Sequence, residues 1–338
     1  MNDDTLSEVL RAVRLRSAVF FDVEASSPWV AEAPPSSEIA HSVMPGFEHV
    51  IEYHFVASGS CWASPINVSA PPIRVVAGDV VAFPHGDAHV LSSEPGMRGK
   101  PNLSDYRAPK NASELPFLLN SGGGGMDRTQ FICGFLGCDL YPFNPLIESL
   151  PRMLHAPGTD LSRGRWWEEL MRFALRETVE KRAGAGGILA KIGEVMFVEL
   201  LRYYVETIPK ENTGLLRGVQ DRQISRALNS IHQQPAYSWT LERLAKNVGM
   251  SRSSFSERFT DLVGMSPMHY IQNWRLQVAA SRLLDQHTKI SRIAEEVGYE
   301  SEAAFTRAFK KSTGLPPAAW RSRKLSLSKA SSPDQTVL

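Results

Sequence analysis

Apolar positions in the first 140 residues fall in short runs rich in Val, Ile and Phe, separated by Pro and Gly. Short β-branched runs bounded by turn residues are typical of strands in a sandwich or small barrel. An amphipathic helix is predicted before them, at residues 4–16. The predicted strands span residues 17–24, 38–44, 50–57, 74–83, 88–92 and 129–136.

Helical spacing of apolar residues replaces this pattern from residue 144 onward. It predicts helices at residues 163–182 and 188–207, with a glycine-rich break between them and a linker at 209–217. The second helix is apolar over more than one stripe, so it needs two packing partners. The β-rich region is one partner. The other is either the same helix of a second protomer or further structure within one protomer.

An internal repeat occupies the C-terminal third, at residues 240–267 and 289–317. Each copy predicts a helix, then a Gly where a positive φ costs least, then a Ser that caps a second helix. The second helix of each copy carries two Phe four residues apart, which predicts one buried face. This is the pattern of a helix-turn-helix. The matching residues are Gly249 and Gly298, Ser251 and Ser301, Phe255 with Phe259, and Phe305 with Phe309.

The faces opposite these Phe pairs are predicted to meet DNA. Arg307 suits a bidentate contact to a guanine edge, whereas Arg252, Arg258 and Lys311 suit phosphate neutralisation. Any one of these cations could equally be a solvated surface charge. The candidate DNA-binding residues are Arg252, Ser253, Ser256, Glu257, Arg258, Thr260, Glu302, Ala303, Thr306, Arg307, Lys310 and Lys311.

Charge is distributed unevenly along the chain. Residues 222–324 contain 16 Lys and Arg against 8 Asp and Glu, a balance of +8, while the whole chain carries +1 and the remainder therefore −7. A basic module beside an acidic one fits phosphate binding by the basic module alone.

The repeat resembles the DNA-binding domain of the AraC/XylS family of bacterial transcription regulators. The second copy carries the closest match: Ile293-Ala294, Gly298-Tyr299, Ser301, Phe305, Arg307, Phe309-Lys310, Gly314, Pro317 and Trp320-Arg321. The resemblance implies two helix-turn-helix units joined by a long helix, at residues 268–286, with recognition helices in successive major-groove segments. It also implies promoter DNA as a partner, RNA polymerase if the protein activates, and a homodimer.

A second motif lies in the β-rich region. Gly78, Pro84, Gly86 and His89 have the spacing of the second cupin signature, and Glu52 precedes Gly59 as in the first, although the expected His-x-His pair is missing. The region thus resembles the cupin-type sensor domain of many AraC-family regulators. The implied fold class is α+β, with an N-terminal cupin-like β-barrel and helical hairpin followed by an all-α double helix-turn-helix. The predicted divisions are a sensor domain at 1–155, the hairpin and linker at 156–217, where protomers could dimerise, the DNA-binding domain at 218–324 and a disordered tail at 325–338.

Four residues in this region are candidate metal or redox groups: His54, His89, Cys133 and Cys138. Together they would form a Cys₂His₂ site of the kind that binds zinc. The alternatives are a thiol redox sensor, or two small buried thiols with two core histidines. His85 is an alternate ligand, and Cys61 is expected to be a packed thiol. The cupin with its Cys-Gly-x-x-Gly-Cys stretch resembles a subgroup of these regulators that includes a reactive-chlorine sensor.

These patterns predict a non-enzymatic DNA-binding regulator whose promoter binding responds to a small molecule, metal or oxidant in the cupin domain. The alternative is a metal-dependent cupin enzyme fused to a DNA-binding module, which the missing His-x-His disfavours because metal catalysis needs several fixed ligands. The acidic start, the lack of a long apolar run and only three Cys indicate a cytoplasmic protein without a membrane span. No motif distinguishes activation from repression.

Overall fold

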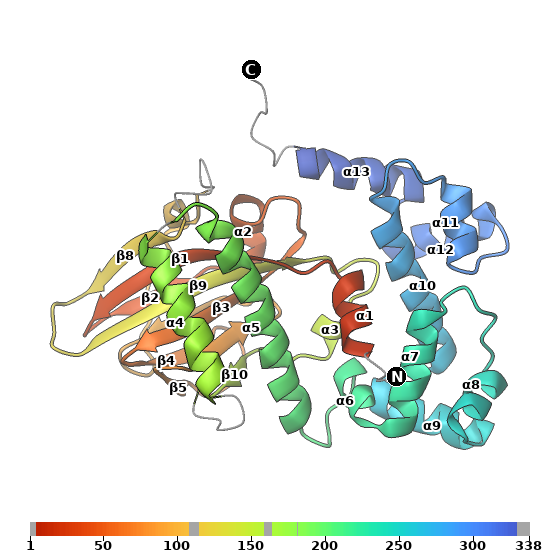
Figure 1. Cartoon of the computed structure of the whole chain (residues 1–338), viewed down its shortest axis with the longest axis horizontal. Helices are drawn as coiled ribbons and strands as arrows, with labels where there is room; N and C mark the ends of the chain where they lie inside the picture. Colours follow the sequence, from red (N-terminus) through yellow and green to blue (C-terminus); the bar gives the residue numbers. More distant parts are fainter. Residues whose placement is uncertain (1–4, 108–114, 159–163, 181, 330–338) are drawn as a thin grey trace. The chain divides into compact units, whose positions relative to one another are not determined.

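The computed structural model describes residues 5–107, 115–158, 164–180 and 182–329 of the 338-residue chain. They form two compact units. The sheet unit comprises Leu15–Cys138 and Leu150–Tyr204. The helical unit comprises Val205–Leu338 together with two upstream stretches, Met1–Arg14 and Asp139–Ser149, as far as these are described. Figure 1 shows the elements of both units along the chain.

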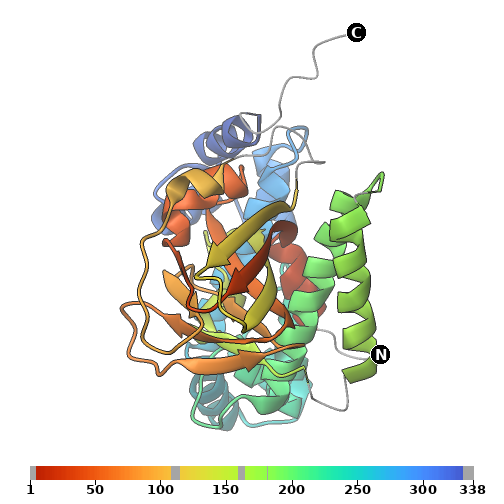
Figure 2. The ribbon, with the colours of Figure 1, turned by 90° about the vertical axis from the view of Figure 1, so that its left-hand side faces the viewer.

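Ten strands of the sheet unit form two sheets (Figures 1 and 2). The larger sheet has the order β10-β6-β3-β9-β1-β8 and the smaller one β2-β7-β4-β5. Adjacent strands are antiparallel except for β1 and β8, which are parallel. The strands are β1 (Arg16–Ser26), β2 (Val30–Ala33), β3 (His49–Ser58), β4 (Ser60–Pro65), β5 (Ile73–Val76), β6 (Val80–Phe83), β7 (His89–Ser92), β8 (Phe117–Gly122), β9 (Arg128–Cys138) and β10 (Leu154–Ala156).

The core of the sheet unit draws on both sheets, with Phe20, Phe83 and Phe135 from the larger and Ala63 and Leu91 from the smaller. Burial of this apolar surface is the main favourable term that holds the sheets together. The predicted α+β class, with a cupin-like sheet region followed by a helical region, is confirmed. The strands, however, pair as two separate sheets and not as one closed barrel.

Several strand predictions need correction. Residues 38–44 are not a strand but most of helix α2 (Ser36–Val43), which follows Pro35 and buries Ile39, Ala40 and Val43 on one face. The predicted strand 74–83 breaks into β5 and β6 because the chain turns at Gly78, where φ is +95°. Strands β2, β4, β8 and β10 were missed; all are short, and their apolar residues are interrupted by polar ones.

Helices α4 (Gly164–Glu180) and α5 (Ala185–Thr207) lie side by side against the larger sheet, in green in Figures 1 and 2. The close approach of α5 depends on Gly193. A Cβ at this position would lie 2.1 Å from the Ser17 hydroxyl and 2.6 Å from that of Tyr53. On α4, the Trp167 indole donates to the carbonyl of Gly78 at 3.1 Å. The sequence-predicted helices at 163–182 and 188–207 correspond to this pair.

The helical unit contains two helix-turn-helix units joined by α10 (Pro267–Leu283). The first pairs α8 (Leu241–Val248) with α9 (Arg252–Val263), and the second pairs α11 (Ile290–Glu296) with α12 (Glu302–Thr313). The other helices are α1 (Thr5–Ala12), α3 (Pro145–Glu148), α6 (Leu215–Gln220), α7 (Arg222–Gln233) and α13 (Pro317–Lys329).

The turn chemistry expected from the repeat is present in both copies. Gly249 and Gly298 have φ of +73° and +84°. The hydroxyl of Ser251 accepts from the Ser254 amide, and that of Ser301 accepts from the Ala304 amide, each at 3.2 Å. Such caps each contribute about 1 kcal/mol to helix stability.

Two boundaries differ from the sequence-based divisions. Residues 5–14 and 139–149, which fall within the predicted sensor domain, belong to the helical unit. The tail predicted to be disordered from residue 325 is helical as far as Lys329, the end of α13. Residues 330–338 lie outside the described part of the chain. None of the described helices combines the length and hydropathy that a bilayer crossing demands.

Candidate nucleic-acid interface and sensor cluster

The two predicted recognition helices, α9 and α12, present the expected faces. Each Phe of the two pairs is completely buried. Ten of the twelve candidate DNA-binding residues are exposed. The other two, Ser256 and Thr306, are half-buried. The helical periodicity of the repeat therefore predicted correctly which face of each helix is buried and which is open to solvent.

The cations of α9 are held by acidic partners. Arg258 Nε donates to Asp221 Oδ2 at 2.9 Å, and the other oxygen of Asp221 caps α7 by accepting from two amides. Arg252 pairs with Glu242 at 3.0 Å. Thr260 donates to the carbonyl of Ser256 in its own helix.

The cations of α12 are arranged differently. Within the described residues, Arg307, Lys310 and Lys311 make no ion pair or side-chain hydrogen bond. Three unpaired cations on one exposed face attract a polyanion without first breaking an internal contact.

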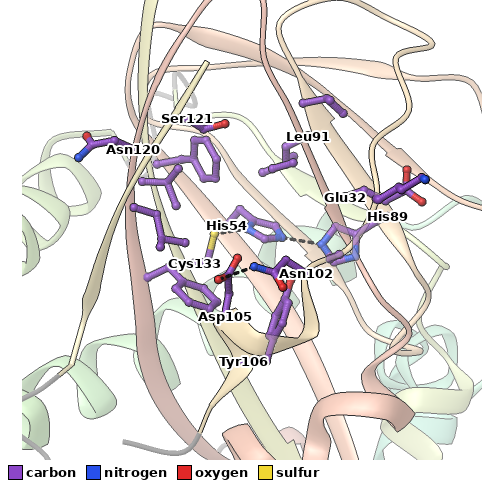
Figure 3. A pocket seen from close by; sticks show the side chains of 18 residues that line it. Glu32, His54, His89, Leu91, Asn102, Asp105, Tyr106, Asn120, Ser121 and Cys133 are labelled. Atoms are coloured by element: carbon purple, nitrogen blue, oxygen red, sulfur yellow. Dashed lines mark hydrogen bonds between the residues drawn. The ribbon is translucent and has the colours of Figure 1, made fainter. Parts of the chain in front are cut away.

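A buried polar cluster lies in the sheet unit, where β3, β7 and β9 carry His54, His89 and Cys133 (Figure 3). His54 lies directly opposite Cys133 in the register of β3 and β9. The thiol of Cys133 is 2.8 Å from His54 Nδ1, and the two histidine Nε2 atoms are 2.7 Å apart. His89 Nδ1 lies 3.0 Å from the carbonyl oxygen of Asp87.

These contacts fix one consistent set of protons. Because a carbonyl can only accept, His89 Nδ1 carries a hydrogen and its Nε2 is an acceptor. His54 must then donate through Nε2 and accept at Nδ1 from the Cys133 thiol. The result is a chain of neutral groups that runs from the Cys133 thiol through both imidazoles to the backbone.

Burial explains why this chain is neutral. It lowers the pKa of His54 well below the usual value, with a further decrease caused by His89, and it lowers the pKa of His89 to about 4. Burial likewise raises the pKa of the Cys133 thiol well above its usual range. A neutral thiol is a weak nucleophile, so this environment does not activate Cys133.

Glu52 completes the cluster. Ligand atoms of Glu52, His54 and His89 all lie within 4.8 Å of one another. Glu52 is buried, burial raises its pKa well above the usual value, and its Oε1 has no hydrogen-bond partner within the described structure. Leaving a buried carboxyl oxygen unpaired costs about 1–3 kcal/mol. Two imidazoles and one carboxylate are a donor set that suits zinc, with His89 oriented through its backbone contact.

The predicted Cys₂His₂ set is only partly assembled. Cys138 lies opposite His49 in the register, five residues beyond Cys133 on the same strand. Because side chains alternate between faces, an odd separation directs the two thiols to opposite faces of the sheet. Of the other two candidates, His85 contacts the carbonyl of Leu150 instead, and Cys61 is a buried thiol as expected. The third potential ligand beside the two histidines is therefore Glu52 and not Cys138.

A cavity of about 250 Å³ opens beside the cluster. His54, His89 and Cys133 line its floor, with Phe21 and Phe131 among the apolar walls. Figure 3 shows Asn102, Asp105 and Tyr106 on one side and Asn120 and Ser121 on another. A small ligand or ion can therefore reach buried imidazoles without unfolding of the sheets.

Comparison with known families agrees with both units. A family model described as cupin matches residues 4–206, and one described as a helix-turn-helix domain matches residues 244–323. The chain belongs to the AraC-type transcription regulators that carry an N-terminal cupin domain, and the AraC-type domain implies that it binds DNA.

Its relatives are named as transcription regulators. An AraC-like regulator of Streptomyces lividans is 27% identical over 94% of this chain and 98% of its own. The regulator AlkR of Acinetobacter baylyi is 26% identical over 94% of this chain and 99% of its own. The RCS-specific transcriptional activator RclR of Escherichia coli is 28% identical over 58% of this chain and 69% of its own.

Proposed function

We propose that this protein binds specific promoter sequences through α9 and α12, and that a divalent metal such as zinc, held by Glu52, His54 and His89, changes its affinity for DNA. The observation that carries the metal part is the buried, unpaired Oε1 of Glu52 beside two imidazoles. A cation would supply the missing partner of that oxygen and favour its ionised form.

Metal binding explains the cluster better than thiol oxidation or catalysis. The raised pKa of Cys133 disfavours the thiolate that oxidants attack. For the alternative of a cupin enzyme, the relatives named as regulators offer no support. Cys133 stays next to His54, so it supports the orientation of that ring and does not add a fourth ligand in this geometry.

The test combines metal content with DNA binding by the full chain. The probe is a duplex selected by the protein from a random DNA pool, titrated at fixed salt with zinc or with chelator. We expect about one zinc per chain and a change in DNA affinity of at least about fivefold, the lower range of measured allosteric coupling. Glu52→Gln and His89→Ala are expected to lose both, whereas the matched control His85→Ala, outside the cluster, is expected to keep both. Retention of zinc by Glu52→Gln and His89→Ala would rule out this site.

A homodimer, contact with RNA polymerase in the case of an activator, and a cytoplasmic location beside the chromosome also belong to this proposal. Support for the dimer comes from α5, where Ile188 and Val195 are 38% and 42% exposed and stand two helical turns apart. Val195→Glu is expected to give a monomer in sedimentation velocity. An unchanged sedimentation coefficient would exclude this face.

A further inference from the structure

Two segments of the helical unit come from far upstream in the sequence. We call residues 5–14 and 139–149 together the clasp. Helix α1 packs against α7 and α10, and its Val9 is completely buried, as is Val13 just after it. Helix α3 packs against α6. The two segments are joined to each other by the Asp139 amide, which donates to the carbonyl of Val13 at 3.2 Å.

The clasp is bound by the middle of α10, the helix that joins the two helix-turn-helix units. Gln277 is only 1% exposed. Its amide nitrogen donates to the carbonyl of Ala12 at 3.0 Å, and its amide oxygen accepts from the backbone amide of Phe143 at 3.2 Å. One buried side chain thus holds both segments, and removing it would leave two buried backbone groups without this partner.

The clasp also reaches α13, which follows the second helix-turn-helix. Lys324 Nζ lies 2.8 Å from Asp139 Oδ1, and the two side chains are 3% and 5% exposed. Arg14 approaches the other oxygen of Asp139 at 3.5 Å. A buried ion pair adds little net stability because both charges must be desolvated, but it tolerates few alternative geometries.

We propose that the clasp is a positioning element of the DNA-binding unit that fixes the spacing between the two recognition helices. It contacts α7, which packs against α8 of the first helix-turn-helix, the joining helix α10 through Gln277, and α13, which follows the second helix-turn-helix, through Lys324. Arg275 of α10 makes a separate bridge, from the carbonyl of Pro235 to that of Gly298. Two recognition helices must meet major-groove segments about 34 Å apart, so their spacing decides which DNA fits.

The clasp is also the route by which the sheet unit controls DNA binding. Arg14 is followed by Leu15 and β1, and Asp139 directly follows Cys138, the last residue of β9. Strand β9 carries Cys133, which contacts His54 in the sensor cluster. This second part rests on the proposed function, whereas the positioning role does not.

The positioning role is tested by DNA spacing. The full chain is titrated with its selected duplex and with duplexes that have one or two base pairs inserted between the two contacted segments. We expect the native chain to lose affinity steeply with insertion, and Gln277→Ala and the double variant Asp139→Asn, Lys324→Met to reduce that penalty roughly five- to tenfold. The control is Gln233→Ala on α7, whose amide contacts only Asn229 of the same helix among the residues that the structure describes.

Each outcome decides the proposal. If the clasp variants show the spacing profile of Gln233→Ala, the positioning role is wrong. If Gln277→Ala does not fold, Gln277→Met takes its place, because Met keeps the side-chain volume and makes neither hydrogen bond. If the clasp links the sheet unit to DNA binding, the clasp variants should still bind zinc but their DNA affinity should no longer respond to zinc. A full zinc effect on DNA affinity in these variants would overturn this role of the clasp. No zinc effect in the native chain would instead refute the proposed function and leave the spacing result intact.

Discussion

The two helix-turn-helix units share one sequence pattern but differ in the state of their cations. In the first, Arg258 and Arg252 are held by Asp221 and Glu242. In the second, Arg307, Lys310 and Lys311 make no ion pair within the described residues. The same fold therefore offers DNA a partly neutralised surface on α9 and a charged surface on α12.

This difference matters because an ion pair on the protein competes with phosphate. A cation that must leave a carboxylate gains less from DNA than one that exchanges only water and counterions. We therefore expect α12 to dominate affinity, and α9 to act mainly through fit. The repeat in the sequence indicates two equivalent helix-turn-helix units. The acidic residues near α9 make the two units unequal in the charge available to DNA.

The largest expected effect tests the base-reading role of α12. Arg307→Ala should weaken binding to the selected duplex by about 1–3 kcal/mol, roughly 5- to 150-fold, because a bidentate guanine contact is lost. A titration at fixed salt measures it, with Arg258→Ala as the matched change on α9. Equal losses in the two variants would refute the inequality of the units.

The next largest effect is a difference in acid stability between the two helix-turn-helix regions. On α7, which packs against α8 of the first helix-turn-helix, His232 is buried against Tyr270 and Trp274, and burial lowers its pKa to about 3. Below its ordinary pKa of about 6.5 the unfolded chain binds a proton that the folded chain does not, so stability falls as pH falls from about 6.5 toward 3. Between pH 6.5 and 5 the loss is about 2 kcal/mol.

Hydrogen exchange checks this expectation. After correction for intrinsic rates, amides of α7 should lose more protection than those of α12 over this pH range, and His232→Gln should remove the difference. Equal loss in α7 and α12 of the native chain would show that His232 does not control acid stability.

The salt dependence of DNA affinity tests whether the unpaired lysines of α12 contact phosphate. Lys310→Ala and Lys311→Ala should each reduce the slope of log affinity against log salt by about 1, without changing which sequence is preferred. Lys246→Ala on α8 is the control, because that residue is exposed outside both recognition helices. A slope unchanged from that of Lys246→Ala would show that neither lysine contacts phosphate.

The smallest expected effect comes from a variant that reduces the charge difference between α9 and α12. Asp221→Ser should keep the cap of α7, because Ser caps about as well as Asp, and should free Arg258. The salt slope should then steepen by up to about 1. If the slope stays the same, Arg258 is already available to DNA in the native chain.

The buried and exposed faces of α9 and α12 could be predicted from sequence because their determinants are local. The spacing of Phe255 and Phe259 fixes one face of a helix, and Gly249 with Ser251 fixes its start. A helix and a strand were confused at residues 38–44 because a short apolar run fits both periods. Pro35 before the run and Glu38 in its first turn were the available signals for a helix.

The sensor cluster was predictable in part. Alternation along β3 placed Glu52 and His54 on one face, so Glu52 could have been chosen as a ligand. The predicted strand ends at 136, whereas β9 continues to Cys138, so alternation along the predicted strand does not reach the second Cys. The clasp gave no local signal. Its contacts join Gln277 to Ala12 and to Phe143, across 265 and 134 residues of sequence.

The clasp makes the DNA-binding unit discontinuous, and this limits what can be learned by cutting the protein apart. A fragment that begins at residue 205 contains both helix-turn-helix motifs but lacks Asp139, Ala12 and Phe143. It would lose the groups that pair with the ammonium of Lys324 and the amide of Gln277, and the surface that the clasp covers would be exposed to water. Residues 5–14 and 139–149 therefore complete the helical unit, and along the chain the sheet unit is inserted within it.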